Sequence, residues 1–195
     1  PFRDEKIITA WNGLVLSGLA EAAKITGNPA SIDAAKRTVD FIFEKMFRDG
    51  FLLHTYKDGA AKLLGYLDDY AFLAVGLLDL YEAAFERSYL DRAVELAEIM
   101  LEEFWDDHDG GFFLTGKSHE QLISKAKPIF DASIPSGNAM ATELVLRDPP
   151  QSTAGLTEAL QTFVKARIAP YKYPRLIEFA RDLPPTAAGK LQGVR

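Results

Sequence analysis

The run GYLDDYAFLAVGLLDLYEAAF, residues 65–85, decides the fold of this chain. Its apolar residues and the absence of proline predict a helix from Tyr66 to Phe85. A second helix is predicted from Tyr89 to Trp105, and a glycine turn with the short segment 111–114 follows it. The pattern is that of a helix hairpin with a short extended connection after it.

The same order of two helices and an extended segment occurs earlier in the chain. Residues 7–25 predict a helix that ends at Gly27-Asn28-Pro29, and Ser31 is expected to cap a second helix that ends by Asp49-Gly50. An extended segment over residues 51–56 follows. The units align with an offset of 58 residues, at Gly18 and Gly76, Leu19 and Leu77, Ile32 and Leu90, Ala35 and Ala93, and Phe47 and Trp105. The chain therefore contains a repeated helix hairpin.

A third unit opens at Pro135-Ser136-Gly137-Asn138, but its helix meets Asp148-Pro149-Pro150 after about three turns. Hairpins of this kind bury their apolar faces only against stacked neighbours, in an open solenoid or in a closed ring. We therefore predict a mainly α repeat over residues 1–147, a linker over residues 148–155, and a short α+β tail over residues 156–195.

Composition places the chain among ordinary globular proteins. It is 48% hydrophobic and 26% charged, and no apolar run approaches the roughly 20 residues that cross a bilayer. We expect a cytoplasmic protein without a membrane partner. The absence of cysteine excludes disulfides, thiol catalysis and thiolate metal sites. Residues 156–195 contain seven Lys or Arg and three acidic residues, a net charge of +4. Because the whole chain has a net charge of −6, residues 1–155 carry −10. We expect no nucleic-acid binding from such an acidic body.

Polar and aromatic residues gather near the start of the first helix of each unit. Because these helix ends should share one mouth, and because aromatic faces beside carboxylates and amides suit a sugar, we predict a small sugar-like ligand. The candidate substrate-binding residues are Trp11, Asn12, Asp68, Asp69, Tyr70, Ser136 and Asn138.

An alternative interpretation makes the same residues structural. Asp68 and Ser136 would then cap or open helices, and Trp11 would lie in the core. The adjacent Asp68 and Asp69 diverge by about 100° on a helix and do not by themselves form a facing carboxylate pair. Glu21 and Asp79 are expected to face solvent.

The histidines His54, His108 and His119 have no spacing typical of a metal site, so we predict none. In the tail, the loop 183–190 presents Lys190 after a glycine. Such a lysine is either a mobile charge for a phosphate or carboxylate, or part of a frayed terminus.

Three motifs, KIITAWNGL (residues 6–14), GYLDDYAF (residues 65–72) and IPSGN (residues 134–138), resemble the spermatogenesis-associated, thioredoxin-domain-containing family. The resemblance covers residues 1–147. It implies a partial α/α toroid similar to six-hairpin glycosidases and N-acylglucosamine epimerases, with a carbohydrate-like pocket.

Residues 163–175 and 183–190 resemble the C-terminal end of AMP-forming acyl-CoA synthetases, the benzoate-CoA ligase branch in particular. In that family the lysine that matches Lys190 helps to form the acyl-adenylate. The resemblance implies a latent catalytic role for Lys190, and a need for ATP and CoA, only together with an ATP-binding domain. No other cofactor is expected.

These expectations combine into one leading hypothesis and two alternatives. The chain is expected to be an incomplete α/α-toroid protein, related to carbohydrate-active folds, without independent catalysis. The first alternative is an acyl-CoA ligase piece that supplies the adenylation lysine. The second is a binding or assembly module that forms a homodimer through exposed helix faces.

Overall fold

The computed structural model describes residues 4–120 and 123–147. Their helices are α1 (Thr9–Thr26), α2 (Pro29–Lys45), α3 (Leu67–Ala84), α4 (Arg87–Glu103) and α5 (Gly137–Arg147), and their strands are β1 (Ile7–Ile8), β2 (Phe47–Arg48), β3 (Phe51–Lys57) and β4 (Ala60–Leu64). The predicted linker 148–155 and tail 156–195, with Lys190, lie outside these residues. That division of the chain therefore remains a prediction.

The predicted helix hairpins are confirmed, and the repeat holds to the residue. Helices α1 and α3 each have 18 residues and begin 58 positions apart, at Thr9 and Leu67. Helices α2 and α4 each have 17 residues and also begin 58 positions apart, at Pro29 and Arg87. The described part of the chain is mainly helical, as predicted.

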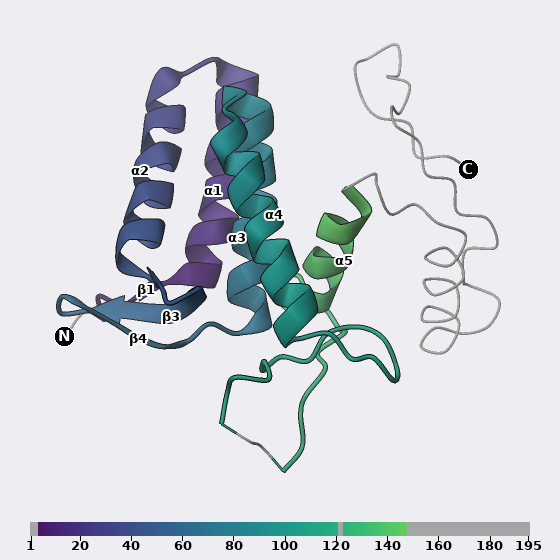
Figure 1. The fold of residues 1–195 in the computed structure, drawn as a ribbon. Helices are drawn as coiled ribbons and strands as arrows, with labels where there is room; N and C mark the ends of the chain where they lie inside the picture. Colours follow the sequence, from purple (N-terminus) through teal and green to yellow (C-terminus); the bar gives the residue numbers. More distant parts are fainter. Residues whose placement is uncertain (1–3, 121–122, 148–195) are drawn as a thin grey trace, which may run out of the picture. The chain divides into compact units, whose positions relative to one another are not determined.

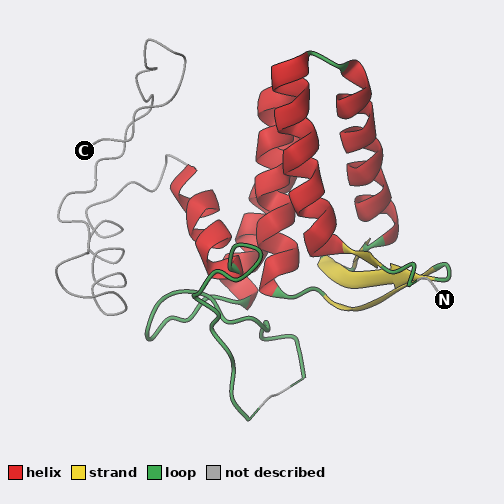
Figure 2. Ribbon diagram, turned by 180° about the vertical axis from the view of Figure 1, so that it is seen from behind, coloured by secondary structure: helices red, strands yellow, loops and turns green. Residues whose placement is uncertain are grey.

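The helices form two layers. Helices α1, α3 and α5 follow one another across the molecule, and we call them the inner helices (Figures 1 and 2). Helix α2 packs on α1, and α4 packs on α3. Only one side of α2 and of α4 is buried, whereas α3 is buried over most of its length. Asp79 on α3 is only 8% exposed, so the expectation that it faces solvent is wrong.

Two glycines let α1 and α3 approach closely. A Cβ atom added at Gly13 would lie 2.6 Å from the backbone nitrogen of Leu73, and one added at Gly76 would lie 2.7 Å from the carbonyl oxygen of Gly13. Real Cβ atoms do not come this near to backbone atoms. The crossing of the two inner helices therefore requires glycine at both positions.

Helix α2 begins earlier than predicted. The side chain of Asn28 accepts a hydrogen bond from the backbone N–H of Ala30 at 3.0 Å, and Pro29 occupies the first helical position, where its missing N–H costs nothing. Asn28, rather than Ser31, is therefore the capping residue. Gly27 ends α1 in the left-handed conformation, with φ of 65°.

A small antiparallel sheet connects the two hairpins. Strand β3 pairs with β1, β2 and β4, and the turn between β3 and β4 holds Asp58 and Gly59 at φ of 50° and 79°. The extended segment predicted at residues 51–56 is confirmed, and β4 was not predicted. The second unit retains one antiparallel bridge of this kind. Trp105, the counterpart of Phe47, pairs with Phe112, as Phe47 pairs with Leu52.

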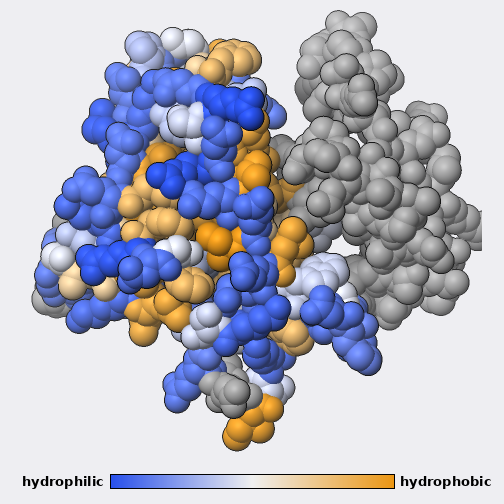
Figure 3. Space-filling view, viewed as in Figure 1, coloured by the Kyte–Doolittle hydropathy of each residue, from blue (hydrophilic) through white to orange (hydrophobic). Residues whose placement is uncertain are grey.

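Apolar side chains also reach the surface. Figure 3 shows them gathered between α2 and α4, with polar residues on either side. Val94 and Leu101 of α4 are 38% and 41% exposed. A search of the described helices for one both long and apolar enough to cross a bilayer gives no candidate.

Candidate functional site

The N-terminal ends of α1, α3 and α5 lie at the same end of the helices, beside the sheet, and we call this region the mouth (Figure 1). The backbone N–H of Ala10 donates to Asp69 at 2.8 Å, which joins α1 to α3. The carboxylate of Asp68 lies against Gly137, which joins α3 to α5. The three clusters that the sequence singled out therefore meet at one end of the molecule.

Asp69 is the centre of this region, and its side chain is fully buried. One oxygen accepts the N–H of Ala10, while the other accepts the N–H of Tyr66 and contacts Nδ1 of His54, all at 2.8 Å. The Tyr66 bond is one half of a capping box at the start of α3. Asp69 therefore holds two helix ends and a strand together.

Tyr70, Ser136 and Asn138 are also committed to contacts within the protein. Burial raises the pKa of Tyr70 to about 12, and its hydroxyl accepts the backbone N–H of Leu52 at 2.9 Å. Asn138 accepts the N–H of Phe112 at 2.8 Å and donates to that residue's carbonyl at 2.9 Å. Ser136 accepts the N–H of Ala139 at 3.2 Å, as a helix cap does.

Asp68 is different, because its carboxylate is not saturated. Its Oδ1 is enclosed and makes no hydrogen bond of normal geometry with the described residues. Burial raises the pKa of Asp68, and the charge of Asp69 adds to this, whereas the nearby backbone amide of Gly137 acts in the opposite direction. Asp68 is therefore a half-buried carboxylate whose unpartnered oxygen is enclosed between α3 and the start of α5.

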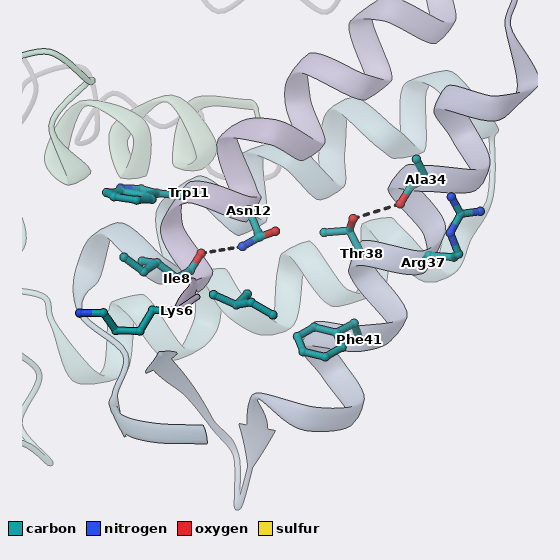
Figure 4. Close-up of a pocket in the computed structure, with 9 residues that line it drawn as sticks. Lys6, Ile8, Trp11, Asn12, Ala34, Arg37, Thr38 and Phe41 are labelled. Atoms are coloured by element: carbon teal, nitrogen blue, oxygen red, sulfur yellow. Dashed lines mark hydrogen bonds between the residues drawn. The ribbon is translucent and has the colours of Figure 1, made fainter. Parts of the chain in front are cut away.

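Trp11 and Asn12 line a hollow of about 450 Å³ between α1 and α2, with Lys6, Ile7, Ile8, Ala34, Arg37, Thr38 and Phe41. Trp11 is 60% exposed, so the alternative that placed it in the core is wrong. Figure 4 shows Trp11 at one end of the hollow and Arg37 at the other, with Asn12 facing Thr38 between them. Asn12 donates to the carbonyl of Ile8 at 2.8 Å, which fixes its carboxamide.

Two histidines that the sequence analysis did not select lie near the mouth. The rings of His54 and His119 both contact the ring of Tyr66, with centroids 5.0 and 5.5 Å from it. Nε2 of His119 is buried and has no hydrogen-bond partner among the described residues. Tyr66, which both rings contact, is distant from each histidine in the sequence, so only the fold brings the three rings together.

The His54–Asp69 contact predicts a pH dependence of stability. The hydrogen bond to Asp69 raises the pKa of His54 above its ordinary value of 6.5, against the opposing effect of burial. Protonated His54 therefore stabilises the fold. This stabilisation is fully present below the ordinary pKa of histidine and is lost as the pH rises through the folded-state pKa. His54→Gln should therefore lower the free energy of unfolding more at about pH 5.5 than at about pH 8.5.

Urea unfolding at both pH values checks this expectation. His108→Gln is the matched control, because the side chain of His108 is 91% exposed and pairs with the neighbouring Asp109. An equal loss at both pH values for His54→Gln would mean that the charge of His54 does not contribute.

Comparison with solved structures places this arrangement among the α/α toroids of the six-hairpin glycosidase-like kind. The cellobiose 2-epimerase of Spirochaeta thermophila superposes with a TM-score of 0.63 at 17% identity, over 85% of this chain and 44% of that one. The GH76 α-mannanase BT2949 of Bacteroides thetaiotaomicron gives 0.62 at 17% identity, over 84% and 45%. The predicted toroid fold is confirmed.

Curated relatives of two different kinds match the chain. Spermatogenesis-associated protein 20 of Rattus norvegicus is 36% identical over 155 residues, 74% of this chain and 20% of that protein. Acyl-coenzyme A synthetase ACSM2A of Homo sapiens is 41% identical over 71 residues, 36% of this chain and 12% of that protein. Benzoate–CoA ligase of Thauera aromatica is 60% identical over 42 residues, 20% and 8%.

Both predicted resemblances are thereby confirmed. The chain spans about a fifth of the length of the spermatogenesis-associated relative, and less of the two ligases. No protein-family model matches the chain.

Proposed function

We propose that residues 1–147 form a carbohydrate-binding part of an α/α toroid that catalyses no reaction by itself. The observation that carries this proposal is the hollow of about 450 Å³ beside the exposed indole of Trp11. Its volume falls in the range of small-molecule sites, and its lining mixes aromatic and hydrogen-bonding groups.

The lining suits the two-sided chemistry of a sugar. The indole of Trp11 offers a flat apolar face for a pyranose ring, and it is held at the end of α1. Asn12, Thr38 and Arg37 offer hydrogen-bonding groups for hydroxyls.

The carboxylates of the mouth support binding rather than hydrolysis. Glycoside hydrolysis uses two carboxyl groups about 5–9.5 Å apart on opposite sides of the bond that breaks. Asp68 and Asp69 are neighbours on one helix, and all the contacts of Asp69 are made within the protein. A catalytic pair would need a second free carboxylate from outside this arrangement.

The solved neighbours add a weaker argument. Their names include a cellobiose 2-epimerase and an α-mannanase, which act on sugars. At 17% identity this likeness extends to the fold and not to the substrate. It makes β-linked glucose and α-linked mannose disaccharides the first ligands to test.

Sugar binding should be visible in tryptophan fluorescence. The chain has two tryptophans, so Trp105→Phe leaves Trp11 as the sole reporter. Cellobiose or an α-mannobiose should change its emission in a saturable way. By calorimetry, Trp11→Ala should weaken binding at least tenfold, or about 1.4 kcal/mol, because the stacking face is lost.

Phe85→Ala is the matched control, because Phe85 is an aromatic side chain that is 82% exposed beyond the other end of α3. It should leave sugar affinity unchanged. The proposal fails if neither disaccharide gives saturable binding up to millimolar concentration, or if Trp11→Ala binds as well as the parent protein.

A second candidate function rests on the resemblance to acyl-CoA ligases. The 60% identity to benzoate–CoA ligase over 42 residues favours a role for Lys190 in acyl-adenylate formation. In that reaction a carboxylate attacks the α-phosphorus of ATP and releases pyrophosphate, and a lysine stabilises the charge between the two groups. Lys190 lies outside the described residues, and this role requires an ATP-binding domain.

Exchange of pyrophosphate into ATP, with benzoate present, tests this candidate. The exchange should occur when the chain is added to a ligase that lacks its own C-terminal part, and Lys190→Ala should abolish it. No exchange with the parent chain would reject this role.

A further inference from the structure

One side of α1 carries an uncharged row of residues, which we call the open stripe: Val15, Gly18, Ala22 and Ile25. These positions follow one another at steps of three and four residues, so they lie along one face of the helix. Val15 is 54% exposed and Ile25 is 81% exposed. A continuous apolar helix face in water indicates a surface for another protein element.

The internal repeat indicates which element covers such a face. The residues 58 positions further along the chain, on α3, are Leu73, Gly76, Leu80 and Ala83. Leu73 and Leu80 are fully buried, and α1 is the helix that crosses them, with its carbonyl at Gly13 against Gly76. The counterpart of the open stripe is therefore covered by a neighbouring inner helix.

Gly18 and Gly76 make this correspondence specific. At Gly76 a side chain would collide with the backbone of α1. This explains why glycine stands there, although glycine weakens a helix. At Gly18 an added Cβ atom would meet nothing within 4 Å. The same residue, in the same place of the repeat, leaves room for the backbone of a helix that is not among the described helices.

The complementary face occurs on α5, the last of the three inner helices. Helix α1 packs on α3 through the side that contains Gly13, which follows Asn12. In α5 the matching pair is Asn138-Ala139, so the same side of α5 contains Ala139 and, one turn later, Thr142. Ala139 is exposed and Thr142 only half-buried. The described residues thus carry both halves of an inner-helix contact, and both halves are at least partly exposed.

We infer that a second copy of this chain covers the open stripe. Helix α5 of one copy lies on α1 of the other, and a twofold axis repeats the contact in return. Each copy contributes α1, α3 and α5, so the two inner rows close on each other. The contact does not depend on sugar binding, because it uses positions of α1 beyond Trp11.

Sedimentation velocity of the full chain over a concentration series tests this inference. The expected species at high concentration has twice the 21.6 kDa mass of the chain. Val15→Lys and Ala139→Lys should each weaken the dimer at least tenfold, because each places a charge in one half of the contact. Gly18→Leu should also give a monomer, while its helix content by circular dichroism is unchanged.

Val94→Lys is the matched control, because Val94 is an exposed valine on α4, away from the inner row. It should leave the dimer intact. A parent chain that stays monomeric at every concentration overturns the inference, and so does a dimer that survives Val15→Lys and Gly18→Leu. A ladder of larger multiples overturns the twofold closure.

Discussion

Asp69→Ala is expected to lower the free energy of unfolding by about 3–5 kcal/mol, the range for removing one member of a buried, hydrogen-bonded charged group. The change leaves the N–H groups of Ala10 and Tyr66 without their acceptor, and it removes the partner of His54. The ends of α1 and α3 would both lose a cap. Urea unfolding followed by circular dichroism measures the loss.

Two further variants separate the role of Asp69 from general effects of substitution. Asp69→Asn keeps the shape and one acceptor oxygen, so its loss should be smaller than that of Asp69→Ala. Asp33→Ala changes an exposed carboxylate on α2 and should stay within about 0.5 kcal/mol of the parent. A loss below about 1 kcal/mol for Asp69→Ala would contradict the role of this carboxylate as a joint cap.

Gly13→Ala is expected to lower the free energy of unfolding by about 2–3 kcal/mol, since overpacking forces the backbones of α1 and α3 apart. The added methyl would lie 2.6 Å from the nitrogen of Leu73 and 2.7 Å from the carbonyl oxygen of Phe72. Backbone atoms within a helix cannot move aside as the end of a side chain can. Thermal unfolding of dilute protein measures the change.

Gly18→Ala is the matched control on the same helix, and it should have the opposite sign. No atom lies within 4 Å of the added methyl, so the gain in helix propensity should stabilise the dilute protein by about 0.5–1 kcal/mol. If both substitutions shift stability in the same direction, the close crossing of α1 and α3 is not the reason for Gly13.

The helical part of the fold could be predicted because two independent signals agree. Apolar spacing marks each helix, and the 58-residue offset locates the second hairpin from the first. Strand β4 has no such signal, because its residues do not alternate and Leu63 takes a left-handed φ of 64°. Its position depends on pairing with β3, which is a tertiary property.

The candidate site shows where sequence reasoning stops. The sequence could predict that Trp11, Asp68 and Ser136 gather at one end of the inner helices, because each lies at the start of a helix of the same layer. It could not separate a capping carboxylate from one with a free oxygen, since Asp68 and Asp69 are identical neighbours. Only burial and hydrogen-bond geometry distinguish them, and the same holds for Asp79, which the surrounding helices bury.

The two-layer arrangement has a consequence for the dynamics of the chain. Twelve residues of α3 are buried, compared with six of α1, because α3 has a covering helix and an inner neighbour on either side. Amide hydrogens exchange with solvent through openings whose free energy follows such burial. The amides of α3 should therefore exchange last, those of α1 earlier, and those at the solvent-facing side of α2 and α4 first, so that α3 is the last element of the repeat to open.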